Sequence, residues 1–135
     1  MAFKFNQICD DQGRVGTFVF LSAEASIVGG QQQRKYADMK LEAEEFLINQ
    51  CSSMYSAILR PGLVYHEQER PWSIPLGVAS NLGHKLLSKV DASKAGPPGT
   101  NLRVLVDHII KEALTSHNDE RGSGHKIIRA AEMKS

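Results

Sequence analysis

Two short apolar runs, separated by a longer amphipathic stretch, dominate the first half of the sequence. Residues 17–21 (TFVFL) and 55–61 (YSAILRP) are rich in aromatic and β-branched residues and show little alternation with polar ones. Such runs predict strands that are buried on both faces, as in a parallel sheet. Between them, the spacing of apolar positions over residues 34–50 predicts a helix. Two buried strands joined by an amphipathic helix fit a right-handed crossover between parallel neighbours.

Weaker patterns predict the remaining elements. Residues 3–10 predict a short helix ended by Gly13, with Phe5 and Ile8 facing inward. The other expected elements are a helix near 76–89, a helix within 102–114 that starts near Val106, a last strand near 125–131, and an exposed, flexible linker over 90–101. Because strands alternate with helices, we expect one α/β domain over the whole chain, with a parallel sheet of three or four strands and packed helices.

Composition restricts the function classes only weakly. The chain has 135 residues, of which 41% are apolar and 23% charged, and this is ordinary for one globular domain. The net charge of +1 gives no bulk attraction to nucleic acid or to an anionic membrane. No apolar run approaches the ~20 residues that span a bilayer, so we expect no transmembrane segment. The first residues show neither a signal-peptide nor a transit-peptide pattern.

Cysteines, histidines and glycines offer little chemistry of their own. Cys9 and Cys51 lie far apart and predict two reduced, partly buried thiols. The five histidines show no HxxxH or HExxH spacing, so no metal site is expected. The stretches GSGHKI and GPPGTN lack the glycine pattern or the N–H donors of a phosphate-binding loop, and both predict turns.

The head of the long helix carries the best candidate for chemistry. Tyr36 and Lys40 stand four residues apart and therefore emerge on one helical face. The expected core-facing stripe on that face is Met39, Ala43, Phe46 and Leu47. An ammonium one turn from a phenol stabilises the phenolate, which suits proton transfer to or from an alcohol or carbonyl oxygen. The alternative is a Lys40 whose ammonium reaches water while Tyr36 packs.

The order of the motifs is more specific than the pair alone. A buried strand that ends in Ser22 is followed by Tyr-x-x-x-Lys, a second buried strand and Arg60-Pro61-Gly62. This order resembles the second half of the short-chain dehydrogenase/reductase fold, in its extended or atypical branch, over roughly residues 3–115. The stretches FVFLSAEAS, KYADMKLEAEEFL and AILRPGLVYHEQE look most like the atypical mitochondrial members, among them the nucleotide-binding accessory subunit of respiratory complex I and a fungal protein associated with ubiquinone biosynthesis.

The resemblance implies a role for each matching position. Tyr36 would be the acid/base, and Lys40 would bind the nicotinamide ribose of NAD or NADP and stabilise the phenolate. Pro61 and Gly62 would line the nicotinamide pocket. The implied compartment is the mitochondrion, with the cytoplasm as the other option.

The third catalytic member of the family, a hydroxyl, has no secure counterpart. Glu24 stands where the resemblance places that hydroxyl. Ser22 or Ser26 could substitute for it, although Ser22 could instead cap the end of its strand.

The sequence departs from the family pattern in lacking the first half of the fold. The glycine-rich turn, the acidic ribose clamp and several strands are absent, so we expect a partial Rossmann-like sheet without its N-terminal nucleotide-binding half. Two functions remain open. One is an atypical NAD(P)-binding oxidoreductase-like protein that is not catalytic alone, and the other is a non-catalytic structural or assembly subunit. Either implies a protein partner, the missing half, or self-association through exposed apolar surface.

Overall fold

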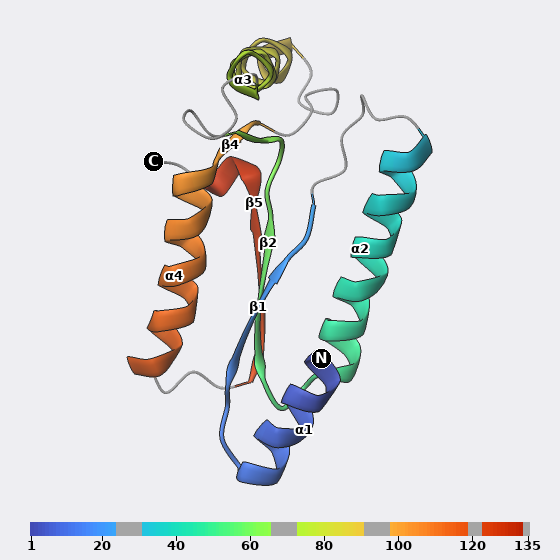
Figure 1. Ribbon diagram of the computed structural model, residues 1–135, viewed down its shortest axis with the longest axis vertical. Coiled ribbons are helices and arrows are strands. Elements are labelled where there is room, and N and C mark those ends of the chain that lie inside the picture. The colour runs from blue at the N-terminus through green and yellow to red at the C-terminus, as the bar shows by residue number, and fades with distance from the viewer. Residues whose placement is uncertain (24–30, 66–72, 91–97, 119–122, 134–135) are drawn as a thin grey trace.

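A three-stranded parallel sheet forms the centre of the computed structural model (Figure 1). Its strands are β1 (Thr17–Leu21), β2 (Tyr55–Arg60) and β5 (Gly124–Arg129), in the order β1-β2-β5. Leu21 pairs with Leu59, and Leu59 pairs with Ile128. The predicted parallel pairing of 17–21 with 56–60 is therefore confirmed. The structure describes residues 1–23, 31–65, 73–90, 98–118 and 123–133.

Helices cover both faces of this sheet. The described residues form the α-helices α1 (Ala2–Gln12), α2 (Gln31–Gln50), α3 (Ser73–Val90) and α4 (Leu102–Asn118). Figure 1 shows α2 on one side of the sheet and α4 on the other, with α1 beside the lower end of α2. The predicted α/β architecture, a small parallel sheet with packed helices, is confirmed. None of the helices in the described ranges is long and apolar enough to cross a membrane.

The hands of the two connections in the sheet differ. The strand order advances in one direction from β1 through β2 to β5, yet α2 and α4 cover opposite faces. The connection through α2 and the connection through α4 must therefore have opposite hands. Since about 98% of parallel crossovers are right-handed, one of these two belongs to the rare class.

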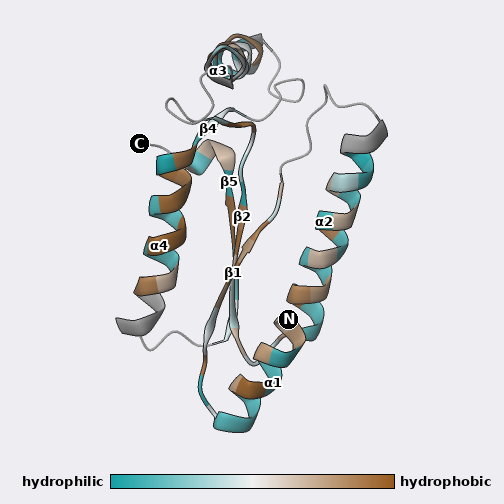
Figure 2. Cartoon of the chain, viewed as in Figure 1, coloured by the Kyte–Doolittle hydropathy of each residue, from teal (hydrophilic) through white to brown (hydrophobic). Residues whose placement is uncertain are grey.

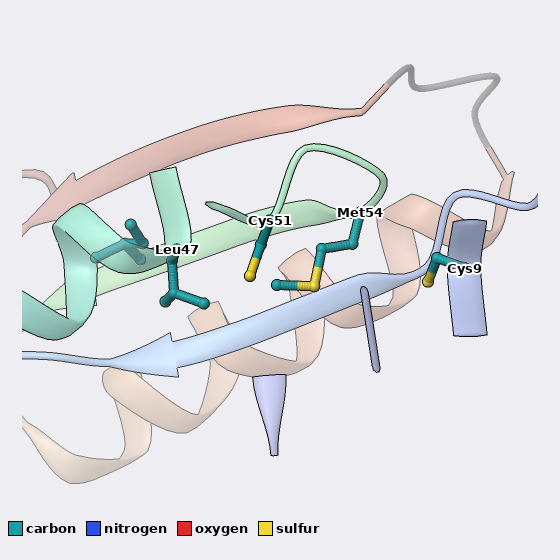
Figure 3. Packing of buried hydrophobic residues seen from close by; sticks show 5 residues of the cluster. Cys9, Leu47, Cys51 and Met54 are labelled. Carbon is teal, nitrogen blue, oxygen red and sulfur yellow. The ribbon is translucent and has the colours of Figure 1, made fainter. Parts of the chain in front are cut away.

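Two apolar clusters hold the layers together, one on each face. The first joins Cys9, Leu47, Cys51 and Met54 to Ile58 of β2, on the side of α1 and α2 (Figure 3). The second lies on the α4 side and consists of Ala57, Leu59, Leu105, Ile128 and Met133. Neighbouring residues of β2 thus point to opposite clusters, as the two-residue period of a strand requires. In Figure 2 the strands are brown over part of their length, and α2 and α4 on either side alternate between brown and teal.

Both cysteines are buried free thiols, as predicted. Burial raises the pKa of the Cys51 thiol above its ordinary value. Both side chains contribute to the cluster beneath α1 and α2, where a neutral thiol packs as a small apolar group.

Helix α1 ends where predicted but buries a different residue. Gly13 adopts the left-handed conformation (φ 59°), and the Arg14 N–H donates to Cys9 O at 3.1 Å, which closes the helix. Phe5 packs against the first cluster, as expected. Ile8 was expected to face inward but is 51% exposed, and Cys9 takes the buried position.

Several expected boundaries were wrong. Helix α4 begins at Leu102, ahead of the expected Val106, because the Asn101 side chain accepts the Arg103 N–H at 2.9 Å and caps the first turn. The last strand ends at Arg129, since the Glu132 carboxylate accepts the Arg129 N–H at 2.8 Å and folds Ala130–Glu132 into a 3-10 turn, η1.

The structure contains a second parallel pair of strands that the sequence pattern did not predict. Strand β3 (Val64–Tyr65) pairs with β4 (Thr100–Asn101). The end of the expected linker 90–101 is therefore part of a sheet, while residues 91–97 lie outside the described ranges.

Strand β1 is less buried than its sequence suggested. Four of its five residues are half-buried and Leu21 is exposed. In the described part of the chain β1 pairs with β2 alone, so it forms an edge of the sheet.

Candidate functional site

The inward face of α2 runs along a different line from the one predicted. Leu47 is buried and Ala43 is half-buried, but Met39 is 62% exposed and Phe46 is exposed. The expected stripe was therefore wrong at these last two positions. The face that meets the sheet carries Lys40, Glu44 and Leu47, a spacing of three or four residues, with the half-exposed Tyr36 one turn before Lys40 and the buried Cys51 just after the helix.

Lys40 links α2 to the end of β1. Its Nζ donates a hydrogen bond to the carbonyl oxygen of Leu21 at 2.8 Å. The same Nζ lies 4.9 Å from the centroid of the Phe20 ring and 5.5 Å from that of Tyr36. These contacts bring Tyr36 and Lys40 to the carboxyl end of the strand, which is the expected location. Among the described residues, two aromatic faces and one carbonyl stabilise the ammonium, and no carboxylate pairs with it.

The Leu21 carbonyl is available because it points away from β2. The Ser22 N–H donates to Leu59 O at 2.8 Å and the Tyr55 N–H donates to Gly16 O at 2.9 Å, so even-numbered residues of β1 face β2. Odd-numbered residues, including Leu21, face the open edge of the sheet. Lys40 thus covers the last carbonyl on this edge.

Ser22 meets the same strand end in a different way. Its main chain extends the β1–β2 ladder, which fits the cap that the sequence suggested as one role. Its side chain is buried at 3% exposure, and Ser22 Oγ has no hydrogen-bond partner within the described residues. A buried hydroxyl left unpaired costs about 1–3 kcal/mol. The alternatives Glu24 and Ser26 lie outside the described ranges.

A buried ion pair, which sequence reasoning missed, fixes α2 against β2. Arg60 Nε donates to Glu44 Oε1 at 3.0 Å and to Oε2 at 3.1 Å, and Arg60 Nη2 adds a third contact. The Glu44 side chain is 2% exposed. The available signal was a glutamate four residues after Lys40 on one helical face, since a carboxylate in a buried stripe requires a cation.

Pro61 and Gly62 continue from this arginine at the end of β2. Pro61 is buried, and the Gly62 N–H donates to Thr100 Oγ1 at 3.2 Å. Thr100 is buried and its own N–H donates to Leu63 O at 2.9 Å. The small sheet β3–β4 therefore holds the Pro61-Gly62 turn. Sequence reasoning missed Thr100 because it stands in the expected linker.

All these groups lie at one end of two neighbouring strands. Leu21 and Leu59 are register partners, so Ser22 and Arg60 lie side by side at this end. Lys40 and Tyr36 approach this edge from α2. The arrangement offers a half-exposed phenol, an ammonium with N–H groups beyond the one bonded to Leu21, and a buried hydroxyl that no described residue pairs with.

Neither a metal centre nor a known relative adds to this description. Within the described residues, His, Cys, Asp and Glu side chains form no group of three that could hold a metal ion. Comparison with protein families, with curated proteins and with solved structures finds no match.

Proposed function

We propose that this chain is the C-terminal portion of a Rossmann-like, NAD(P)-binding oxidoreductase-like fold of the short-chain dehydrogenase/reductase type. The observation that carries the proposal is the bond from Lys40 to Leu21 O, which sets a Tyr-x-x-x-Lys pair at the carboxyl end of a parallel strand. Ligands of open α/β sheets bind at this end. The contact of Lys40 with Leu21 O is what the motif order leads one to expect, and it adds a specific acceptor at the strand end to that order.

The proposed roles follow the chemistry of the side chains. The Tyr36 phenol would exchange a proton with an alcohol or carbonyl oxygen, with the Lys40 ammonium beside its ring. Lys40 has N–H donors beyond the one used by Leu21, which suits ribose hydroxyls. Ser22 Oγ would be the third polar group, and Pro61 and Gly62 would line the nicotinamide side. The nicotinamide group, when bound, would supply hydride transfer.

The same chain is proposed not to turn over alone. The described residues include no glycine-rich turn between a strand and the N-terminus of a helix, the place where a pyrophosphate is bound. In this proposal the nicotinamide end of a cofactor would have partners here, while the described residues offer the pyrophosphate none of the usual kind. Binding of NAD(H) or NADP(H) by this chain is therefore expected to be weak.

A structural or assembly role is the second candidate, and the edge of the sheet favours it. Strand β1 has an apolar sequence and no second neighbour within the described residues. Helix α4 also exposes Val106, Ile110 and Leu114 along one face. A partner that supplies a strand and covers this face would complete the fold. The proposed setting for either role is the mitochondrion, in association with ubiquinone or the respiratory chain.

Titration of the isotope-labelled chain with NADH and NADPH, followed by amide chemical shifts, tests the proposal. We expect binding weaker than about 100 μM, with shifts at the Gly62 amide and around Lys40. These shifts should disappear in Lys40→Ala and persist in Lys35→Ala, which removes an exposed lysine from the same helix. Shifts confined to other regions would contradict the nicotinamide site. Micromolar or tighter binding would contradict the claim that a phosphate cradle is lacking.

A further inference from the structure

Helix α3 turns its polar side toward the rest of the molecule. Asn81 and His84 are half-buried, whereas Val78, Leu82 and Leu86 are more than half exposed. A surface helix normally directs its apolar stripe inward. Figure 1 shows α3 across the upper end of the molecule, beyond β4 and η1. Asn81 and His84 face inward, so polar side chains border the space beneath α3. In a tightly packed interior, apolar side chains would occupy these positions.

That space is an open cavity of about 680 Å³. Its polar lining comes from Tyr65 of β3, Asn81, His84 and Lys85 of α3, and Asn101 of β4. Its apolar lining includes Met133, a member of the cluster on the α4 side. Pockets that hold small organic ligands have volumes of roughly 300–1,000 Å³ and combine an apolar surface with a few polar groups. The cavity matches this description in size and in composition.

The polar groups on its wall are suited to an anion. None of the described residues that line the cavity is acidic. Lys85 contributes a positive charge, and its ammonium makes no ion pair with any residue in the described ranges. The Asn101 carbonyl oxygen already accepts the Arg103 N–H, so this side chain has its two amide N–H groups to offer. A cation in a concave, partly apolar site attracts anions more strongly than the same cation on an open surface.

We propose that this cavity binds a small organic anion whose phosphate or carboxylate group contacts Lys85 and the amides of Asn81 and Asn101. The apolar part of the ligand would rest near Met133. Val104 and Met133 of the cavity lining belong to the cluster on the α4 side of the sheet, whereas Lys40 stands on α2, on the other side, and is not in the lining. The proposal therefore does not depend on the nicotinamide role of Tyr36 and Lys40.

Calorimetric titration of the full chain with adenosine 5′-monophosphate, citrate and uncharged adenosine tests this site. We expect at least one of the two anions to bind, and adenosine to bind at least roughly tenfold more weakly. The nucleotide alone would identify a phosphate site, and citrate alone a carboxylate site. If neither anion binds below about 10 mM, or if adenosine binds as well as the nucleotide, the proposal is wrong.

Two charge reversals on the same helix distinguish binding in the cavity from non-specific electrostatic attraction of the anion to α3. Lys85→Glu should weaken the binding of the anion by at least roughly tenfold. Lys85 and Lys89 are both exposed, but only Lys85 lines the cavity, so Lys89→Glu, one turn further along α3, should weaken binding less than about twofold. Equal losses in the two variants would overturn the proposal. The bound anion should also shift the side-chain amide signals of Asn81 and Asn101, while those of the exposed Asn49 on α2 stay unchanged.

Discussion

At the scale of single residues, charged groups inside apolar surroundings explain most of what is unusual about α2. Lys40 looked anomalous in a helical stripe that meets the sheet. It is stabilised by the Leu21 carbonyl and by the faces of Phe20 and Tyr36. Glu44, one turn further on, is stabilised by Arg60 at the end of β2. Two polar contacts thus fix one face of α2 to the ends of two strands.

Lys40→Met should lower the free energy of unfolding by about 0.5–1 kcal/mol, because the carbonyl at the sheet edge loses its donor while the aliphatic stem is kept. The expected loss is small, since the lysine is only half-buried. Urea denaturation measures it. The matched variant Lys35→Met, which removes an exposed lysine from the same helix, should change stability by less than half as much. A Lys40→Met protein as stable as the wild type would show that the hydrogen bond to Leu21 O does not contribute to the free energy of unfolding.

Arg60→Met should lower the free energy of unfolding by about 3 kcal/mol, because it leaves the buried Glu44 carboxylate without its cation. The double variant Glu44→Leu/Arg60→Met should recover most of that loss, since no buried charge then remains. Removing the exposed Arg34, as Arg34→Met, is the control and should cost little. Equal losses in Arg60→Met and Arg34→Met would refute the structural role of the pair.

Burial of Cys51 makes stability depend on pH on the alkaline side. Its pKa is raised in the folded state above the ordinary value of 9.0, so between the two values the unfolded chain has lost a proton that the folded chain keeps. The stabilising contribution is therefore complete below pH 9 and decreases as the pH rises, by at most about 1.4 kcal/mol per pH unit. We expect the fall in unfolding free energy between pH 8 and 10 to be smaller in Cys51→Ala than in the wild type. An identical fall in both proteins would contradict this.

At the scale of elements, sequence pattern predicted what extends over many residues. Strand β1 was predicted with its observed bounds, and the alternation of strands and helices predicted the parallel sheet, because apolar runs and helical periods report burial directly. Strands β3 and β4 were missed, since two residues are too few to show a period. The start of α4 was missed because the cap belongs to one side chain, Asn101. Which side of a helix is buried can also depend on a distant partner, as Glu44 and Arg60 show.

The candidate site was predictable to a similar extent. The four-residue spacing of Tyr36 and Lys40 and their place after a strand could be read from the chain. That the Leu21 carbonyl accepts the hydrogen bond from Lys40 could not be predicted, because the acceptor depends on which residues of β1 face the open edge of the sheet. Thr100 could not be foreseen either, since it reaches Gly62 across 38 positions in the sequence.

A cap that sets the start of α4 can be removed by one substitution. Asn101→Ala should lower the free energy of unfolding by about 1 kcal/mol and speed hydrogen exchange at the Arg103 amide. Asn101→Asp retains an acceptor at the same place and should keep both properties close to those of the wild type. Slow exchange at Arg103 in Asn101→Ala would mean that another group caps the helix.

At the scale of the whole molecule, the sheet is unevenly protected. Strand β2 has a neighbour on each side, and the ion pairs Glu44–Arg60 and Glu112–Lys126 tie α2 and α4 to the strands on opposite faces. Strand β1 has one neighbour within the described residues, and its odd-numbered residues direct their N–H groups at the open edge. An apolar strand with free donors and acceptors is a template for another strand.

The proposal that this chain is part of a larger Rossmann-like sheet predicts that the open edge of β1 pairs with a strand of another molecule. Sedimentation velocity of the isolated chain at high micromolar concentration measures this most directly, with Val19→Pro as the matched variant. This proline removes an N–H that points to the open edge and leaves the hydrogen bonds to β2 in place. We expect the wild type to self-associate and Val19→Pro to do so much less. A wild-type chain that sediments as a single monomeric species and melts cooperatively would contradict the view that the sheet is incomplete at β1.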